Sequence, residues 1–356
     1  MERILPNRVY LDHAATTPMT AAAIDAVARG HGLWANPSSP HAEGRAARAA
    51  LEGARRAIAD AYGWRGETIL TSGASESLAI ALGRTTAPRR LITAVEHDAV
   101  MRAAGDARVI PVTADGIVDV QALAAMLGDG PAMVCVQWAN SETGVRQPIA
   151  TIADVVHGAG GTLLVDAAQM PATPELAGIA DMVAVSAHKR GGPPGIGALL
   201  VRDLALLHPS GGQERGYRPG TENLLGALGY AAALAEPEPD HAALRARLDD
   251  AIQRSGGEIV AADSPRHPAI GSYRLRGSAA AAQLILLDSA GFAVSAGSAC
   301  SSGSMKPSHV LGAMGWDEGA GREVIRVSFG RTTGAAEVDA FVAAWRQMAR
   351  TTRRAA

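Results

Sequence analysis

Short apolar runs alternate with longer segments of helical periodicity over the first two thirds of the chain. Runs of this kind, rich in β-branched residues and bounded by polar or glycine-rich stretches, are typical of buried strands. They predict strands at Thr68–Thr71, Arg90–Ala94, Arg108–Val112, Ala132–Gln137, Thr162–Asp166, Met182–Ser186 and Ile196–Val201. Residues 43–62 predict an amphipathic helix closed by Gly63, and helical segments separate most of the strands. The alternation predicts an α/β fold with a mostly parallel seven-stranded sheet covered on both faces.

The pattern changes at a Pro-rich, acidic stretch over residues 235–240. Beyond it we expect a helix from His241, a last helix from Ala335, and strands near Ile259, at Ile270–Leu275 and at Val324–Phe329. The sequence therefore predicts two domains. The large domain covers residues 15–235, and a smaller α+β domain covers residues 236–356 together with the N-terminal segment 1–14.

Composition narrows the class of protein. The 356 residues carry a formal net charge of −2, without the basic excess of a general nucleic-acid or membrane-surface binder. No apolar run approaches the roughly 20 residues that a membrane-spanning helix needs. The N-terminus, Met-Glu-Arg-Ile-Leu-Pro-Asn-Arg, lacks the apolar core of a secretion signal. We expect a cytoplasmic enzyme with no nucleic-acid partner and no membrane partner.

The two cysteines stand in contrasting surroundings. Cys135 lies in the apolar run Ala-Met-Val-Cys-Val-Gln-Trp, where a thiol is a small buried hydrophobe. Cys300 lies in Ser-Ala-Gly-Ser-Ala-Cys-Ser-Ser-Gly-Ser, which cannot build a core. Two cysteines are too few for a disulfide framework. The sequence predicts that Cys300 is a reachable loop thiol.

Lysine is rare, since only Lys189 and Lys306 occur among 33 basic side chains. Arginine cannot supply a neutral amine for an imine, whereas lysine can. Lys189 follows a predicted strand, and Asp166 ends another, so both belong to the carboxyl edge of the sheet. An imine-forming lysine and a carboxylate that keeps a pyridine nitrogen protonated are what pyridoxal phosphate (PLP) chemistry requires. The alternative for Asp166 is a helix cap or turn residue. For Lys306 we expect a solvated loop charge, with an altered partner surface as the alternative.

Two further strand ends carry candidate chemistry. Residues 71–77, Thr-Ser-Gly-Ala-Ser-Glu-Ser, link a strand to a helix through small residues. The free backbone N–H groups at a helix start suit a phosphate, although a capped helix without a ligand is the alternative. His97 follows another strand, where an imidazole can lie flat on a cofactor ring or simply be a surface histidine.

Taken together, these pieces resemble a known family: the cysteine desulfurases of the class V aminotransferase group, within the fold-type I PLP enzymes. Nine segments carry the resemblance in the family's order. They are Tyr-Leu-Asp-His-Ala-Ala-Thr-Thr-Pro (10–18), Asn-Pro-Ser-Ser-Pro-His (36–41), residues 71–77, Glu-His-Asp-Ala-Val (96–100), Val-Asp-Ala-Ala-Gln (165–169), Ser-Ala-His-Lys (186–189), Gly-Gly-Gln-Glu-Arg-Gly-Tyr-Arg-Pro-Gly-Thr (211–221), Ser-Ala-Gly-Ser-Ala-Cys-Ser-Ser-Gly (295–303) and Ile-Arg-Val-Ser-Phe-Gly-Arg (325–331).

The resemblance implies pyridoxal 5'-phosphate as cofactor, L-cysteine as substrate and no metal. Sulfur would pass to Cys300 as a persulfide, leaving L-alanine, and then to an acceptor protein for iron–sulfur cluster assembly or thio-modification. The catalytic residues would be Cys300, Lys189 and His97. The cofactor-binding residues would be Ala74, Ser75, His97, Ser141, Asp166, Gln169, Ser186, His188, Lys189 and Thr221, the last from the other subunit of a homodimer. Arg326 and Asn140 would bind the substrate.

One departure from the family pattern falls on the site. The family usually has Asn-Asn-Glu-X-Gly where this chain has Asn140-Ser141-Glu142-Thr143-Gly144. The shorter Ser141 puts rate or substrate choice in question rather than cofactor binding. Two rival readings stay open: another class V PLP enzyme, such as a selenocysteine lyase or an aminotransferase, and a non-catalytic PLP-fold partner protein. The Cys300 loop argues against the aminotransferase, and the presence of both Lys189 and Cys300 argues against the non-catalytic protein.

Overall fold

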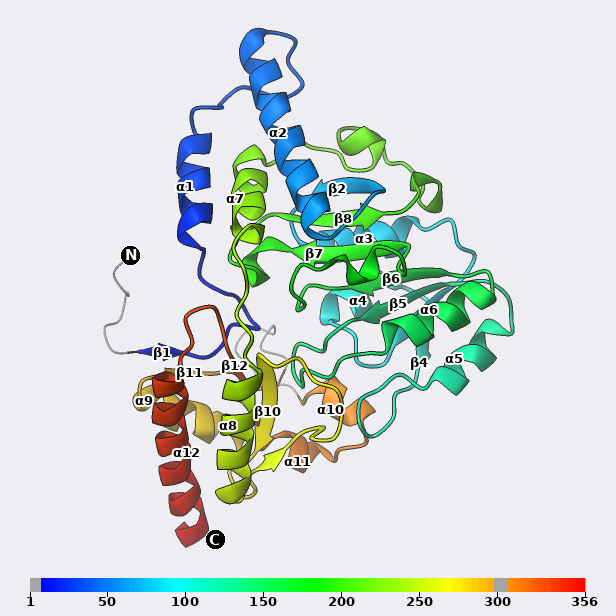
Figure 1. Ribbon diagram of the computed structural model, residues 1–356. Coiled ribbons are helices and arrows are strands. Elements are labelled where there is room, and N and C mark those ends of the chain that lie inside the picture. The colour runs from blue at the N-terminus through cyan, green and yellow to red at the C-terminus, as the bar shows by residue number, and fades with distance from the viewer. Residues whose placement is uncertain (1–7, 298–306, 356) are drawn as a thin grey trace.

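The computed structural model describes residues 8–297 and 307–355, with side chains described up to Thr352 (Figure 1). Cys300 and Lys306 lie outside the described residues, so the predictions for them stay predictions. No helix in the described part of the chain is both long and apolar enough to cross a membrane.

A seven-stranded sheet forms the centre of the molecule, in the order β2-β8-β7-β6-β5-β3-β4. The strands are β2 (Glu67–Thr71), β3 (Arg90–Thr93), β4 (Arg108–Ile110), β5 (Met133–Gln137), β6 (Thr162–Asp166), β7 (Met182–Ser186) and β8 (Gly197–Val201). All are parallel to their neighbours except β8, which runs antiparallel to both β2 and β7. The predicted sheet and each of its strands are confirmed.

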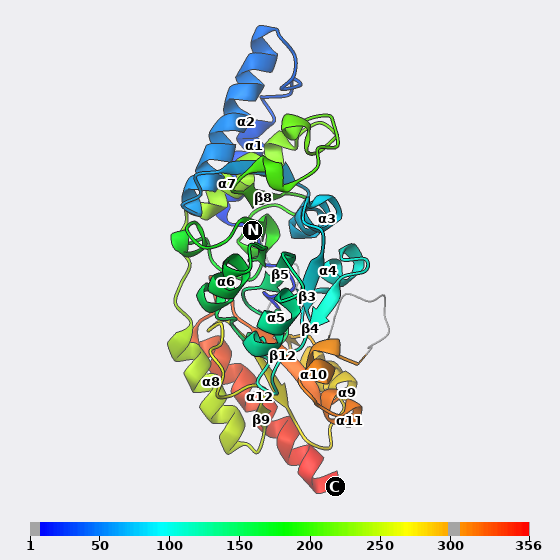
Figure 2. The same ribbon diagram turned by 90° about the vertical axis from the view of Figure 1, so that its right-hand side faces the viewer.

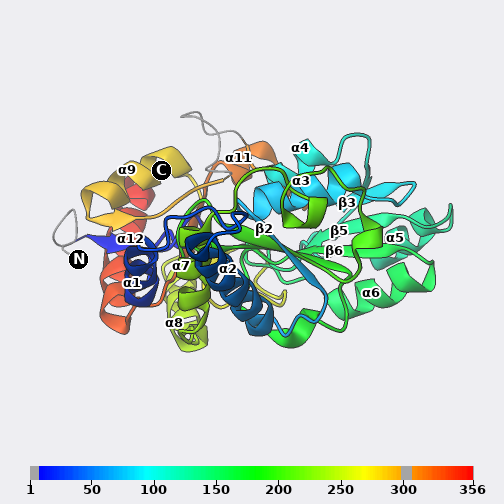
Figure 3. The ribbon, with the colours of Figure 1, turned by 90° about the horizontal axis from the view of Figure 1, so that it is seen from above.

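Helices cover both faces of this sheet (Figure 3). Alternate strand residues such as Leu164 and Met182 pack under α3 (Ala74–Arg84) and α4 (Asp98–Ala103), and Cys135 is fully buried among them. Leu163 and Val165 face the opposite layer. That layer contains α2 (Ala42–Ala61), α5 (Val120–Leu127), α6 (Ile149–Gly158) and α7 (Leu224–Leu234), with α1 (Ala21–Gly30) packed along α7. Short 3-10 turns lie at η1 (Pro174–Leu176), η2 (Ala187–Lys189), η3 (Leu204–Leu206) and η4 (Glu214–Gly216).

A separate hydrophobic core, built around Tyr273, Phe341 and Trp345, organises the C-terminal part of the chain. This part lies below the large sheet in Figure 2. Here β10 (Ile270–Arg274) pairs antiparallel with β12 (Val324–Ser328) and β9 (Glu258–Ile259). The helices are α8 (Ala242–Arg254), α9 (Ala280–Ser289), α10 (His309–Ala313), α11 (Glu318–Gly321) and α12 (Ala335–Ala355).

The N-terminal segment joins this second core rather than the first. Strand β1 (Val9–Tyr10) pairs in parallel with β11 (Phe292–Ala293), and Asp12 forms a bridge to Ser328 of β12. The chain then crosses to the large sheet. The domain boundaries given above remain predictions.

Candidate active site

Lys189 stands at the carboxyl edge of the large sheet, because β7 ends at Ser186 and η2 follows directly. Its Nζ donates a hydrogen bond to the carbonyl oxygen of Ala14, from the N-terminal segment. Gln169 Nε2 donates to the same oxygen at 2.9 Å. Asp166 ends the neighbouring strand β6. The sheet edge thus brings together Lys189, Asp166 and Gln169, as predicted.

Asp166 is a buried carboxylate, 7 % exposed. One of its oxygens, Oδ1, accepts a hydrogen bond from the Ala168 N–H at 2.9 Å. Burial raises its pKa, while this hydrogen bond and the nearby His97 and Lys189 oppose the rise. A buried carboxylate is stabilised by a cation beside it. A protonated pyridine nitrogen is such a cation, so the environment of Asp166 fits a PLP ring.

A second cradle lies where β2 turns into α3. Gly73 precedes the helix with φ of 148°, in a region that favours glycine. A Cβ added at Gly73 would lie 3.7 Å from Ser186 Oγ. The backbone N–H groups of Ala74 and Ser75 have no hydrogen-bond acceptor among the described residues. These free donors at a helix start fit a phosphate group.

His188 borders this edge of the sheet as a neutral imidazole. Burial lowers its pKa to about 4, and the charges of Lys189 and Arg190 act in the same direction. Its Nδ1 lies 3.1 Å from Thr16 Oγ1. The N-terminal segment therefore fixes the orientation of this ring as well as the position of the lysine.

A cavity of about 130 Å³ joins several predicted residues that are distant in sequence. His97, Asn140, Ser141, Lys189 and Arg326 all line it. His97 caps the start of α4, and its Nδ1 accepts a hydrogen bond from the Ala99 N–H at 3.1 Å, which leaves the ring proton on Nε2. The cavity is also lined by Gly297 and His309, which stand on either side of the segment that contains Cys300.

Arg326 is held on two sides within β12. Its Nη1 donates to the Ser141 carbonyl oxygen at 2.9 Å, and its Nη2 donates to Asp12 Oδ1 at 2.7 Å. The residue is 6 % exposed, and its Nε has no hydrogen-bond partner among the residues that the structure describes. The guanidinium is therefore fixed in direction before any substrate carboxylate reaches it.

The side chain of Asn140 is occupied by hydrogen bonds within its own turn and to Val95. Its Oδ1 accepts from the N–H groups of Glu142 (2.9 Å) and Thr143 (2.8 Å), and its Nδ2 donates to the Val95 carbonyl at 3.1 Å. These bonds shape the loop that presents Ser141. A direct contact between Asn140 and the substrate remains a prediction.

Thr221 stands apart from the other predicted residues. It is exposed and lines an open groove with Trp34 and Asn36, and it does not line the cavity that contains Lys189. Sequence reasoning did not single out Asp12, the Ala14 carbonyl or Thr16 as site residues. Their only signal was membership of segment 10–18.

The fold and the site define a class of protein: a PLP-dependent enzyme of fold type I. Residues 9–341 match the Aminotransferase class-V family, and the chain belongs to that family. It is 40% identical over 369 residues to an IscS-like cysteine desulfurase of Mycobacterium tuberculosis, covering 93% of each chain. It is 38% identical over 363 residues to a cysteine desulfurase of Cereibacter sphaeroides, covering 94% of this chain and 93% of that one. The solved structure of a NifS-like protein from Rickettsia africae superposes with a TM-score of 0.87 at 27% identity, covering 96% of this chain and 99% of the other.

Proposed function

We propose that this protein is a cysteine desulfurase, which removes sulfur from L-cysteine and leaves L-alanine and a persulfide on Cys300. One observation carries the proposal: a single cavity is lined by Lys189, by Arg326 and by Gly297 and His309, which bracket the Cys300 segment. The names of the relatives and their coverage of nearly the whole chain support it.

PLP, when bound, supplies an aldehyde for Lys189 and a ring that stabilises negative charge at the substrate Cα. Asp166 would keep the ring nitrogen protonated, Gln169 would contact the ring oxygen, and His97 would lie over the ring. The phosphate would be held by Ala74, Ser75, Ser186 and His188. Each of these residues lies at the carboxyl edge of the large sheet or beside it, where ligands of such sheets bind.

The protein side chains then divide the chemistry. Arg326, fixed by Asp12 and by the Ser141 carbonyl, would bind the substrate carboxylate with its paired N–H donors. The Lys189 amine, displaced by the substrate amine, would take the Cα proton. The Cys300 thiolate would attack the substrate sulfur. A sulfur–sulfur bond forms, the Cβ–S bond breaks with its electron pair left on carbon, and protonation of the carbon gives alanine.

The partners follow from the same proposal. Thr221 would reach the phosphate of a second copy of this chain in a homodimer, which is consistent with its exposure away from its own Lys189. The persulfide would pass to an acceptor protein in the cytoplasm, either an iron–sulfur scaffold or a thio-modification protein.

The test measures sulfide and alanine released from L-cysteine in the presence of a reductant, with the visible absorption of the cofactor recorded in parallel. Wild type should be coloured and should release both products. Cys300→Ala should keep the colour and lose turnover. Cys135→Ala is the matched control, because that thiol is fully buried and does not line the cavity, and it should keep both properties.

A coloured wild type that releases neither product would contradict the desulfurase. A protein that remains colourless after PLP is added would contradict the cofactor assignment. Turnover that survives in Cys300→Ala would contradict the assignment of the nucleophile.

A further inference from the structure

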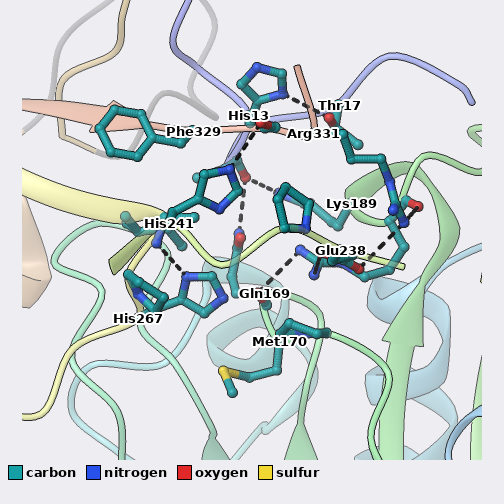
Figure 4. A pocket seen from close by; sticks show the side chains of 18 of the residues that line it. His13, Thr17, Gln169, Met170, Lys189, Glu238, His241, His267, Phe329 and Arg331 are labelled. Carbon is teal, nitrogen blue, oxygen red and sulfur yellow. Dashed lines mark hydrogen bonds and ion pairs between the residues drawn. The ribbon is translucent and has the colours of Figure 1, made fainter. Parts of the chain in front are cut away.

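A second cavity, of about 210 Å³, adjoins the first, because Ala14 and Lys189 line both. Its walls come from segments 13–17, 169–171, 238–241, 267–270 and 329–331, together with Arg146 and Arg190 (Figure 4). Among the residues assigned above to cofactor or substrate, only Lys189 and Gln169 line it. Most of this space is therefore not needed for PLP or for L-cysteine.

The cavity wall carries an excess of positive charge. Arg146, Arg190 and Arg331 line it, whereas Glu238 is the one carboxylate among the described residues that line it. Glu238 Oε2 accepts a hydrogen bond from Arg190 Nη1 at 2.8 Å, and its Oε1 lies 3.7 Å from Arg331 Nη2. Arg146 has no carboxylate partner in the described ranges, and its Nε has no hydrogen-bond partner. One carboxylate cannot balance these cations.

A buried imidazole adds a neutral donor to the same wall. His267 is 6 % exposed, and its Nδ1 accepts a hydrogen bond from the Ala269 N–H at 3.0 Å. The ring proton is therefore on Nε2, and within the described part of the chain that N–H has no acceptor. Burial and the charges of Arg190, Arg245 and Arg146 lower the pKa of His267 to about 3, so it remains neutral.

Histidines are numerous here, since His13 and His241 line the cavity with His267, as Figure 4 shows. They do not make a metal site: residues 8–297 and 307–355 contain no group of three His, Cys, Asp or Glu side chains placed to hold an ion. The unbalanced groups are donors and cations, and those select an anion.

The cavity also has a neighbour that opens to solvent. Arg146 lines a groove of about 480 Å³ in addition to the cavity. Its guanidinium lies over the Trp138 ring, 5.7 Å from the ring centre. A small ion can thus approach Arg146 from the groove without crossing the substrate cavity.

We propose that this cavity binds a small oxyanion, held by Arg146 and His267 beside Lys189. A planar guanidinium and an N–H donor in the wall of the same cavity suit both an inorganic oxyanion and a small carboxylate. Binding requires only the described residues. Its effect on catalysis rests on the proposed function: a negative charge near Lys189 stabilises the protonated amine, which then removes the substrate proton less readily.

Calorimetric titration of the PLP-loaded full chain tests the site, with sulfate and acetate as separate probes at constant ionic strength. We expect saturable binding of one ion per chain, and the two probes distinguish inorganic from carboxylate ligands. Arg146→Gln and His267→Phe should each weaken binding, the former at least tenfold. Arg146→Lys, which keeps the charge but loses the planar paired donors, should bind more tightly than Arg146→Gln and more weakly than wild type, and its residual binding guards against a folding defect.

Two further variants locate the ion. Arg108→Gln, on the edge strand β4, is a control that removes one arginine charge outside the cavity and should leave binding unchanged. Arg326→Gln should also leave it unchanged. Binding that is lost in Arg326→Gln but kept in Arg146→Gln would place the ion in the substrate cavity and overturn the proposal, as would the absence of saturable binding in wild type.

Kinetics supply a second readout. Sulfate or acetate at the proposed site should lower kcat for L-cysteine while leaving KM unchanged, and Arg146→Gln should relieve the effect. Inhibition competitive with L-cysteine would contradict the proposal. Calorimetry does not depend on turnover, so a failure of the proposed desulfurase activity would leave the binding result interpretable.

Discussion

The histidines of the second cavity make a quantitative prediction about acid stability. Burial lowers the pKa of His13 to about 4 and that of His267 to about 3, both from 6.5. The unfolded chain binds these protons more readily than the folded protein does. The contribution of the two histidines to the free energy of unfolding is therefore greatest above pH 6.5, and it is lost as the pH falls from 6.5 toward their pKa values in the folded protein. At pH 5 each histidine lowers the free energy of unfolding by about 2 kcal/mol relative to neutral pH, or about 4 kcal/mol together.

The perturbation is His267→Gln, which removes the titrating ring but keeps a polar side chain of similar reach. The assay is urea unfolding of the PLP-loaded protein at pH 7.5 and at pH 5, followed by circular dichroism. The wild type should lose more stability than the variant between the two conditions, by about 2 kcal/mol. The variant's own stability at pH 7.5 does not enter this difference.

His208→Gln is the matched control, since His208 is exposed on the surface. The loss in its free energy of unfolding between pH 7.5 and pH 5 should equal that of wild type. If His267→Gln shows the same loss between pH 7.5 and pH 5 as wild type, the burial argument for this cavity is refuted.

Three other substitutions test the first cavity. Asp12→Ala removes the partner that fixes Arg326 and should raise KM for L-cysteine about tenfold. Asp12→Asn can still accept the hydrogen bond and should raise KM less. Equal effects of the two variants would contradict an orienting role for Asp12. Gly73→Ala forces a side chain into a φ of 148° next to Ser186 and should weaken PLP binding at least tenfold, as measured by absorbance titration; unchanged affinity would rule out the cradle. Asp166→Asn should keep the fold but lower kcat by about 10² or more, because the ring nitrogen loses its charge partner; a normal kcat in the steady-state assay would contradict that pairing.

The large sheet could be predicted because each strand is a short apolar run with a polar or glycine boundary. Parallel direction followed from the helical segments between strands. The prediction of a mostly parallel sheet did not say which strand runs antiparallel. That strand is β8, and only residues 187–196 connect it to β7. That connection is too short for the usual helical crossover between parallel strands, so the signal was present in the spacing.

The smaller elements escaped prediction for physical reasons. Strands β1 and β11 have two residues each, too few for a periodic pattern, and they pair across most of the chain length. Helix α9 exposes Ile285 and Leu286, so its apolar positions do not mark a single buried face.

The candidate site also contains residues that the sequence predicted and residues that it did not. Side chains at strand ends, such as Lys189 and Asp166, carried a readable signal. The Ala14 carbonyl that accepts from Lys189 did not, because every residue has a carbonyl and its use depends on tertiary structure. Asp12 was visible only as part of a longer motif.

The route of the N-terminal segment connects the reactive amine to the C-terminal core. Residues 9–12 pair with β11 and β12. Two residues later, the Ala14 carbonyl accepts the hydrogen bond from Lys189. Any movement of the C-terminal core relative to the large sheet would therefore be transmitted through this segment to the hydrogen bond of Lys189. A fusion or truncation that loosens the pairing of β1 with β11 should therefore shift the position of the Lys189 amine.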